Sequence, residues 1–91
     1  MTHIFLAGLN HNTAPIEVRE RVSFTRKQLP EALSHLVNRF GEGVILSTCN
    51  RTEVYTSADN LTQGRQAVVQ FLADVHGISP KELEPYLYTL N

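Results

Sequence analysis

Residues 44–56, VILSTCNRTEVYT, contain two short runs of strand-forming residues on either side of a tight connection. Residues 44–48 and 52–56 are rich in β-branched and aromatic side chains, and the second run alternates in polarity, as a half-buried strand does. Residues 49–51, Cys-Asn-Arg, have the length and polarity of a turn. This stretch therefore predicts a β-hairpin with a cysteine in its connection.

Upstream of the hairpin, the sequence predicts one strand and two helices. Residues 3–9 form a nearly continuous apolar run, typical of a central strand covered on both faces. A short helix is expected from Pro15 to about Val22, after a polar loop. Thr25 and Gln28 have capping-box spacing, and apolar residues then recur at helical intervals up to Phe40, so a longer helix is expected to begin near Lys27.

Downstream, a third helix and a last strand are expected. From Thr62 the apolar residues fall on one helical face, and Gly77 ends the pattern. Ser79-Pro80 predicts a further short turn, and residues 86–90 predict a strand. The order strand–helix–strand–strand–helix–strand indicates an α+β, ferredoxin-like split βαβ sandwich (βαββαβ), a four-stranded sheet with helices on one face.

The composition sets limits on the class of protein. Ninety-one residues with 42% hydrophobic and 19% charged side chains suit one small globular domain, residues 1–91. No apolar run is long enough to cross a bilayer, and the N-terminus lacks the pattern of a signal peptide, so no membrane partner is expected. A single cysteine excludes an internal disulfide and fits a reducing compartment, which predicts a cytoplasmic protein.

Basic and acidic side chains are distributed unevenly along the chain, although the net charge is only −1. Residues 1–41 carry five basic and three acidic side chains, whereas residues 42–91 carry three and six. Two interpretations of the basic cluster remain open, contact with RNA phosphate or a solvated surface. Its members are Arg19, Arg21, Arg26 and Lys27.

Neither a metal site nor a dinucleotide loop is predicted. The four histidines and the cysteine lack metal-ligand spacing. His35 and His76 are interpreted as structural or surface residues, and a cation at His76 would complement the dipole of the helix that ends at Gly77. The glycines never form the phosphate-binding patterns of nucleotide sites, so no cofactor is expected to bind this chain by that device.

Cys49 allows two interpretations. An isolated cysteine is most often a small buried hydrophobic residue. A turn position beside Arg51, however, suits a nucleophile, because a guanidinium and turn N–H groups stabilise the thiolate. Arg51 could instead orient a substrate carboxylate, leaving Thr48 and Asn50 to donate or accept hydrogen bonds at the reacting centre.

Three motifs together resemble the N-terminal domain of glutamyl-tRNA reductases. They are GLNHNTAP at 8–15, VRERVSF at 18–24 and LSTCNRTEVY at 46–55, in the right order and spacing. The resemblance implies an enzyme that reduces glutamate charged on tRNA to glutamate-1-semialdehyde with NADPH, the first step of tetrapyrrole (haem) synthesis by the five-carbon route. It implies that Cys49 is the catalytic nucleophile and forms a thioester. It also implies that Thr48, Asn50 and Arg51 line the glutamate pocket, with His11 either shaping that pocket or holding the loop.

The same resemblance implies parts that these residues do not contain. Residues 1–91 would be the N-terminal part of the catalytic, glutamyl-tRNA-binding domain, with the NADPH-binding domain and the domain that forms a homodimer lying elsewhere. The chain alone is then expected, at most, to acylate itself or to hydrolyse the ester slowly, without completing the reduction. The competing hypothesis is a non-catalytic ferredoxin-like regulatory or RNA-binding module with a structural cysteine.

Overall fold

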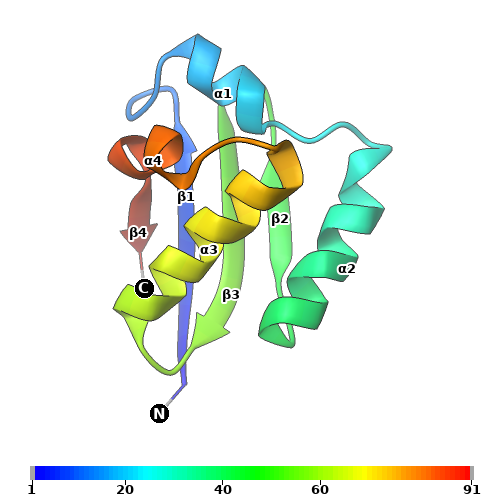
Figure 1. Cartoon of the computed structure of the whole chain (residues 1–91), viewed down its shortest axis with the longest axis vertical. Helices are drawn as coiled ribbons and strands as arrows, with labels where there is room; N and C mark the ends of the chain where they lie inside the picture. Colours follow the sequence, from blue (N-terminus) through cyan, green and yellow to red (C-terminus); the bar gives the residue numbers. More distant parts are fainter. Residues whose placement is uncertain (1, 91) are drawn as a thin grey trace.

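Three antiparallel pairings build the sheet in the computed structural model, which describes residues 2–90 (Figure 1). The strand order across the sheet is β2-β3-β1-β4. In chain order the elements are β1 (His3–Asn10), α1 (Ile16–Val22), α2 (Gln28–Phe40), β2 (Val44–Ser47), β3 (Arg51–Ala58), α3 (Leu61–His76), α4 (Pro80–Leu83), the 3₁₀ helix η1 (Glu84–Tyr86) and β4 (Tyr88–Leu90).

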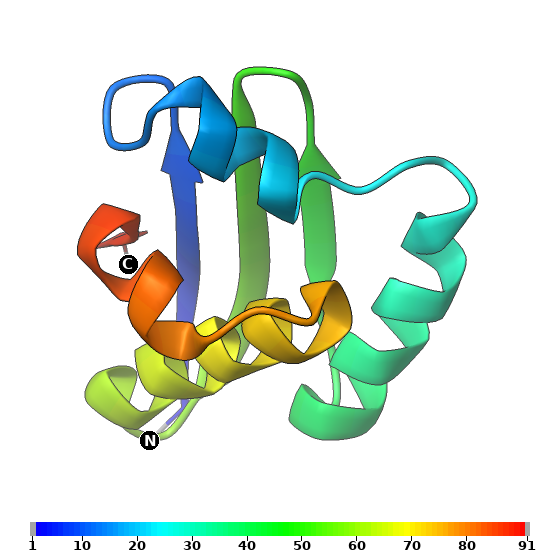
Figure 2. The same ribbon diagram turned by 45° about the horizontal axis from the view of Figure 1, so that its top comes forward.

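The connections confirm the ferredoxin-like prediction. β1 and β2 are joined through helices, and β3 lies between them, antiparallel to both, which is the split βαβ arrangement. β4 then pairs with the other edge of β1. All helices lie on the same side of the sheet (Figure 2).

The core lies between the sheet and this helical layer. Phe5 and Leu9 on β1 and Val54 on β3 are at most 2% exposed and face the helices. α3 supplies the predicted apolar face, because Phe71 and its neighbours on that face are buried. α3 also approaches β1 closely at Gly64, where an added Cβ would lie 2.9 Å from the Phe5 ring.

The prediction that β1 is covered on both faces was wrong. Odd-numbered residues such as Phe5 and Leu9 point into the core, but Ile4 on the opposite face is 76% exposed. No described element packs on that opposite face, which we call the open face. It carries Ile4, Leu6, Gly8, Glu53, Tyr55 and Tyr88, among others.

Several element boundaries differ from the sequence-based expectation. β4 begins at Tyr88 rather than residue 86, because Glu84–Tyr86 form the 3₁₀ helix first. β3 extends from Arg51 to Ala58, beyond the expected 52–56, since all eight of its residues pair with β1. Thr25 and Gln28 do form the predicted reciprocal hydrogen bonds, each side chain accepting from the other's backbone N–H.

The helix α1 positions the part of the molecule that matters most for function. It crosses the end of the sheet at which β1 finishes and β2 turns into β3 (Figures 1 and 2). The loop after β1, α1 and the β2–β3 turn therefore meet at one end of the sheet. Within residues 2–90, none of the helices has the length and apolar character needed to cross a membrane.

Candidate active site

The β2–β3 turn holds four of the predicted site residues in a defined backbone conformation. The backbone N–H of Thr48 donates to the carbonyl of Arg51 at 2.8 Å and closes the turn. The hydroxyl oxygen of Thr48 accepts from the N–H groups of Asn50 and Arg51, both at 3.2 Å. Cys49 thus lies at the tip of a turn that is fixed by the side chain before it.

Cys49 is exposed, as are Thr48, Asn50 and Arg51. The interpretation of this cysteine as a small buried hydrophobic residue was therefore wrong. A thiol at the tip of an ordered, accessible turn can reach an incoming electrophile without a rearrangement of the core.

Three hydrogen bonds tie the hairpin to α1 and the segment that follows it. The N–H of Phe24 donates to the Ser47 hydroxyl oxygen at 2.9 Å. The Thr52 hydroxyl, which is buried, donates to the carbonyl of Val22 at 3.3 Å. The third bond reaches the turn itself, because Arg19 Nη1 donates to the carbonyl of Cys49 at 3.3 Å. The turn is thus held on the strand before it, on the strand after it and at its tip.

His11 lies in the loop that follows β1, at the same end of the sheet. The register pairs Asn10 directly with Arg51, so His11 follows a residue adjacent to the turn. The Asn10 side chain fixes this loop by accepting from the N–H of Asn12 at 2.8 Å and of Thr13 at 3.2 Å. The imidazole is exposed, so the fold brings His11 and the turn to one edge and leaves this side chain accessible.

A buried carboxylate that the sequence analysis did not single out lies next to Arg51. Glu53 is 5% exposed, although it projects from the open face. Its side chain crosses over Gly8 of β1, where an added Cβ would lie 2.9 Å from Glu53 Cγ and 2.3 Å from the carbonyl oxygen of Thr52. This path brings the carboxylate to the hydroxyl of Tyr88 on β4. Glycine is therefore required at position 8 by the close approach of both the β3 backbone and the Glu53 side chain.

Two tyrosines and one arginine surround this carboxylate. The Tyr55 hydroxyl donates to Glu53 Oε1 at 3.0 Å, Tyr88 donates to Oε2, and Arg51 Nε lies 3.9 Å from Oε1. Burial and the hydrogen bond to Glu53 raise the pKa of Tyr88 to about 12. The hydrogen bond to Glu53 also raises the pKa of Tyr55 above its usual value of 10.0. Both phenols therefore remain protonated donors at neutral pH.

The alternation of β3 was the signal that could have revealed this network. Arg51, Glu53 and Tyr55 are two residues apart and so project from one face of the strand. The partner across the sheet, Tyr88, could not be inferred in the same way, because it depends on the register of β4 against β1.

The basic cluster is divided among different contacts. Arg19 reaches Cys49, whereas Arg21 forms an ion pair with Glu82 at 3.0 Å. Arg26 and Lys27 are exposed between α1 and α2. Two of the four cations thus serve contacts within the domain.

Comparison with known proteins gives a consistent assignment. The family described as glutamyl-tRNA reductase, N-terminal domain, matches residues 7–91. This chain belongs to that family. It is 46% identical over 88 residues to a glutamyl-tRNA reductase from Geobacter metallireducens and 47% identical over 85 residues to one from Neisseria meningitidis. These alignments cover 94% and 91% of this chain but only 20% and 19% of the relatives.

A solved structure supports the same glutamyl-tRNA reductase fold. The glutamyl-tRNA reductase from Methanopyrus kandleri is similar with a TM-score of 0.57 and 26% identity, covering 94% of this chain and 18% of that one. The present chain therefore spans about a fifth of the length of its relatives.

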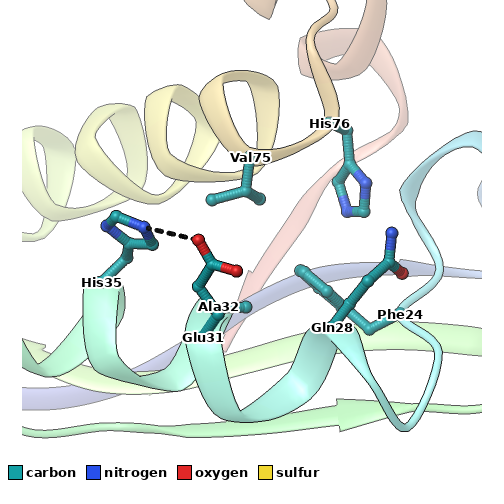
Figure 3. Close-up of a pocket in the computed structure, with 7 residues that line it drawn as sticks. All are labelled: Phe24, Gln28, Glu31, Ala32, His35, Val75 and His76. Atoms are coloured by element: carbon teal, nitrogen blue, oxygen red, sulfur yellow. Dashed lines mark ion pairs between the residues drawn. The ribbon is translucent and has the colours of Figure 1, made fainter.

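A cavity of about 240 Å³ in this glutamyl-tRNA reductase domain lies away from the β2–β3 turn. It opens between α2 and the end of α3, and Gln28 and His76 reach it from these two sides (Figure 3). His76 is half-buried, and burial lowers its pKa below 6.5, so the predicted cation at this helix end is disfavoured. His35, on α2, is exposed and lies 3.8 Å from Glu31. The cavity contains none of the predicted site residues.

Clusters that could hold a metal were sought among the His, Cys, Asp and Glu side chains of the described residues. No cluster of three or more His, Cys, Asp or Glu suited to a metal occurs in residues 2–90. The sequence has no glycine-rich phosphate loop, and the turn at Cys49 offers a thiol and polar side chains instead. The turn residues Thr48, Cys49 and Asn50 are exposed.

Proposed function

We propose that this chain is the N-terminal, substrate-binding part of the catalytic domain of a glutamyl-tRNA reductase and that Cys49 is its nucleophile. The observation that carries the proposal is the exposed position of Cys49 at the tip of the fixed turn, beside Arg51. The whole enzyme would convert glutamyl-tRNA to glutamate-1-semialdehyde for tetrapyrrole synthesis.

The step assigned to this chain is an acyl transfer. The Cys49 thiolate attacks the carbonyl carbon of the ester that joins glutamate to tRNA, and a carbon–sulfur bond forms. The ester carbon–oxygen bond then breaks, and the tRNA leaves as an alcohol after taking up a proton. An ester is already activated, so the leaving group needs little assistance, and the resulting thioester remains electrophilic.

The neighbouring side chains suit recognition of the glutamyl group. The exposed guanidinium of Arg51 can donate two parallel hydrogen bonds to a carboxylate of the substrate. Its Nε faces Glu53, which leaves the terminal nitrogens directed elsewhere. Asn50 and Thr48 flank the thiol and can contact the reacting carbonyl or the substrate amine, and His11 is placed to contribute from the adjacent loop.

The reduction of the thioester is assigned to parts of the enzyme outside this chain. NADPH would supply the hydride, but the described residues form no dinucleotide site. We therefore propose that residues 1–91 carry out acylation alone, and that NADPH binding and dimerisation belong to other domains of the full-length protein.

Transfer of radiolabelled glutamate from glutamyl-tRNA to the purified chain tests this proposal. We expect stable labelling of the wild-type chain and no labelling of Cys49→Ser. Arg51→Gln should lose at least a factor of about ten in labelling rate, since a hydrogen bond to a charged group contributes about 1.5–3 kcal/mol. An unlabelled wild-type chain, or equal labelling of Cys49→Ser, would refute the role of Cys49. Formation of semialdehyde by the chain alone would refute its restriction to acylation.

A further inference from the structure

The guanidinium of Arg19 lies at the nucleophile although the two residues are 30 positions apart. Arg19 projects from the last turn of α1, and its Nη1 donates to the carbonyl oxygen of Cys49 at 3.3 Å. Four covalent bonds separate a cysteine's carbonyl oxygen from its sulfur. The positive charge therefore lies within roughly 8 Å of the sulfur in any rotamer of Cys49.

The burial of Arg19 indicates that its place is fixed. Arg19 is only partly exposed, and its Nε is buried without a hydrogen-bond partner in residues 2–90. Its Nη1, by contrast, does have a protein partner, the carbonyl oxygen of Cys49. The side chain of Arg19 is thus partly covered between α1 and the turn, whereas Arg26 of the same cluster is exposed.

Arg51, the other arginine at the turn, is directed toward a different group. Its Nε faces the buried Glu53 carboxylate at 3.9 Å, and half of its side chain is exposed. The sequence left two tasks for Arg51 alone, stabilising the thiolate and holding a substrate carboxylate. The structure supplies one arginine for each task.

We propose that Arg19 is a positioning residue for Cys49: it fixes the peptide of the nucleophile and provides the permanent positive charge beside the sulfur, which leaves Arg51 for the substrate. This inference rests on the proposed role of Cys49 and adds a division of labour between the two arginines. Arg19 touches the backbone of Cys49 and no reacting atom.

Alkylation of Cys49 by iodoacetamide measures this effect without any substrate. At pH 7 and low salt we expect Arg19→Gln to react about fivefold more slowly than the wild type, as expected for one unit charge at this distance near a surface. Arg19→Lys should react nearly as fast as the wild type, because it keeps the charge. Arg26→Gln is the matched control, since Arg26 is an exposed member of the same cluster, and its rate should be unchanged.

The salt dependence separates the electrostatic role of Arg19 from a merely structural one. Ions screen the effect of a charge, so the Arg19→Gln deficit should shrink in about 1 M salt. A deficit that is equal at low and high salt would overturn the proposal, as would equal rates for Arg19→Gln and Arg26→Gln.

A parallel assay with glutamyl-tRNA keeps the two proposals distinguishable. Slower alkylation and slower glutamate transfer in Arg19→Gln support both. If Arg19→Gln is alkylated more slowly but the wild type accepts no glutamate, the result supports the effect of Arg19 on Cys49 and refutes the proposed function. Should Arg19→Gln fail to fold, Arg19→Met takes its place, because it keeps an unbranched side chain without the charge, and a folded Arg19→Met that is alkylated as fast as the wild type would overturn the proposal.

Discussion

The two faces of the sheet bury different kinds of side chain. On the face that meets the helices, Phe5 and Val54 pack in an apolar core. On the open face, Ile4 is 76% exposed, yet Glu53, which pairs with Gly8 further along β1, is buried and accepts from two tyrosine hydroxyls. One face thus stabilises the fold by removing apolar surface from water, and the other holds a carboxylate by hydrogen bonds. The candidate active site lies at the end of the sheet, next to the polar network.

The largest expected effect is a difference in stability between substitutions at two neighbouring residues of β1, Phe5 and Ile4. Phe5→Ala should lower the free energy of unfolding by about 3–5 kcal/mol, because it opens a cavity in the core. Ile4→Ala should change it by less than about 0.5 kcal/mol, since this side chain faces solvent. Urea denaturation followed by circular dichroism measures both. Equal losses would show that the open face is as tightly packed as the helical one.

A methyl group at Gly8 tests how closely β3 approaches β1 at this position. In Gly8→Ala the new Cβ would lie 2.3 Å from the carbonyl oxygen of Thr52, so the backbone has to shift. We expect a loss of about 1–3 kcal/mol of unfolding free energy, the usual cost of overpacking. The same denaturation experiment measures it. An unchanged urea midpoint would mean that β3 does not approach Gly8 this closely.

Removal of the charge on Glu53 tests the polar network itself. In Glu53→Gln the pKa of Tyr88, about 12 in the wild type, should fall but stay raised, because its burial remains, and the pKa of Tyr55 should fall as well, since the Glu53 hydrogen bond is its main cause. Absorbance of the phenolates during alkaline titration measures this as a shift of the curve to lower pH in the variant. Identical titrations of the two proteins would contradict the network.

The raised pKa of Tyr88 also predicts how the free energy of unfolding changes at alkaline pH. Tyrosine in the unfolded chain ionises near pH 10, before Tyr88 in the folded chain, so unfolding releases a proton in this range. The free energy of unfolding should therefore fall as the pH rises from 10 toward 12, and it should fall less in Glu53→Gln. A steeper fall in the variant would contradict this account.

The smallest effect concerns His76, on the helical side of the sheet. Its pKa is lowered by burial, so between that value and 6.5 the unfolded chain binds more protons than the folded chain. The contribution is fully present above pH 6.5 and is lost as the pH falls through the folded value. Comparing urea midpoints of the wild type and His76→Gln across pH 5–7 measures it. A difference that stays constant over this range would contradict a buried neutral imidazole.

Local patterns in the sequence predicted the fold well. The strand and helix patterns gave the split βαβ order, and the hairpin at 44–56 placed Cys49 in a turn, as the structure confirms. The apolar run of β1 misled, because a residue such as Ile4 is equally apolar whether a helix covers it or not. Hydrophobicity alone does not record how many layers a sheet has.

Contacts between distant segments escaped prediction for a physical reason. The Arg19–Cys49 hydrogen bond and the Glu53–Tyr88 contact each join residues at least 30 positions apart, and both depend on how elements pack. Arg19 looked like any surface cation in the sequence, since charge clusters are usually solvated. The roles of Cys49, Thr48, Asn50, Arg51 and His11 remain predictions from the resemblance, although the fold brings these residues to one end of the sheet.

The central claim is that Cys49 is the nucleophile. Mass spectrometry of the chain after incubation with glutamyl-tRNA tests it most directly, because it identifies which residue is modified. The account predicts a single glutamyl adduct on the peptide that contains Cys49, removed by hydroxylamine as a thioester is. A glutamyl group on any other residue, or a Cys49 peptide that stays unmodified while the chain is folded and its thiol reacts with iodoacetamide, would contradict it.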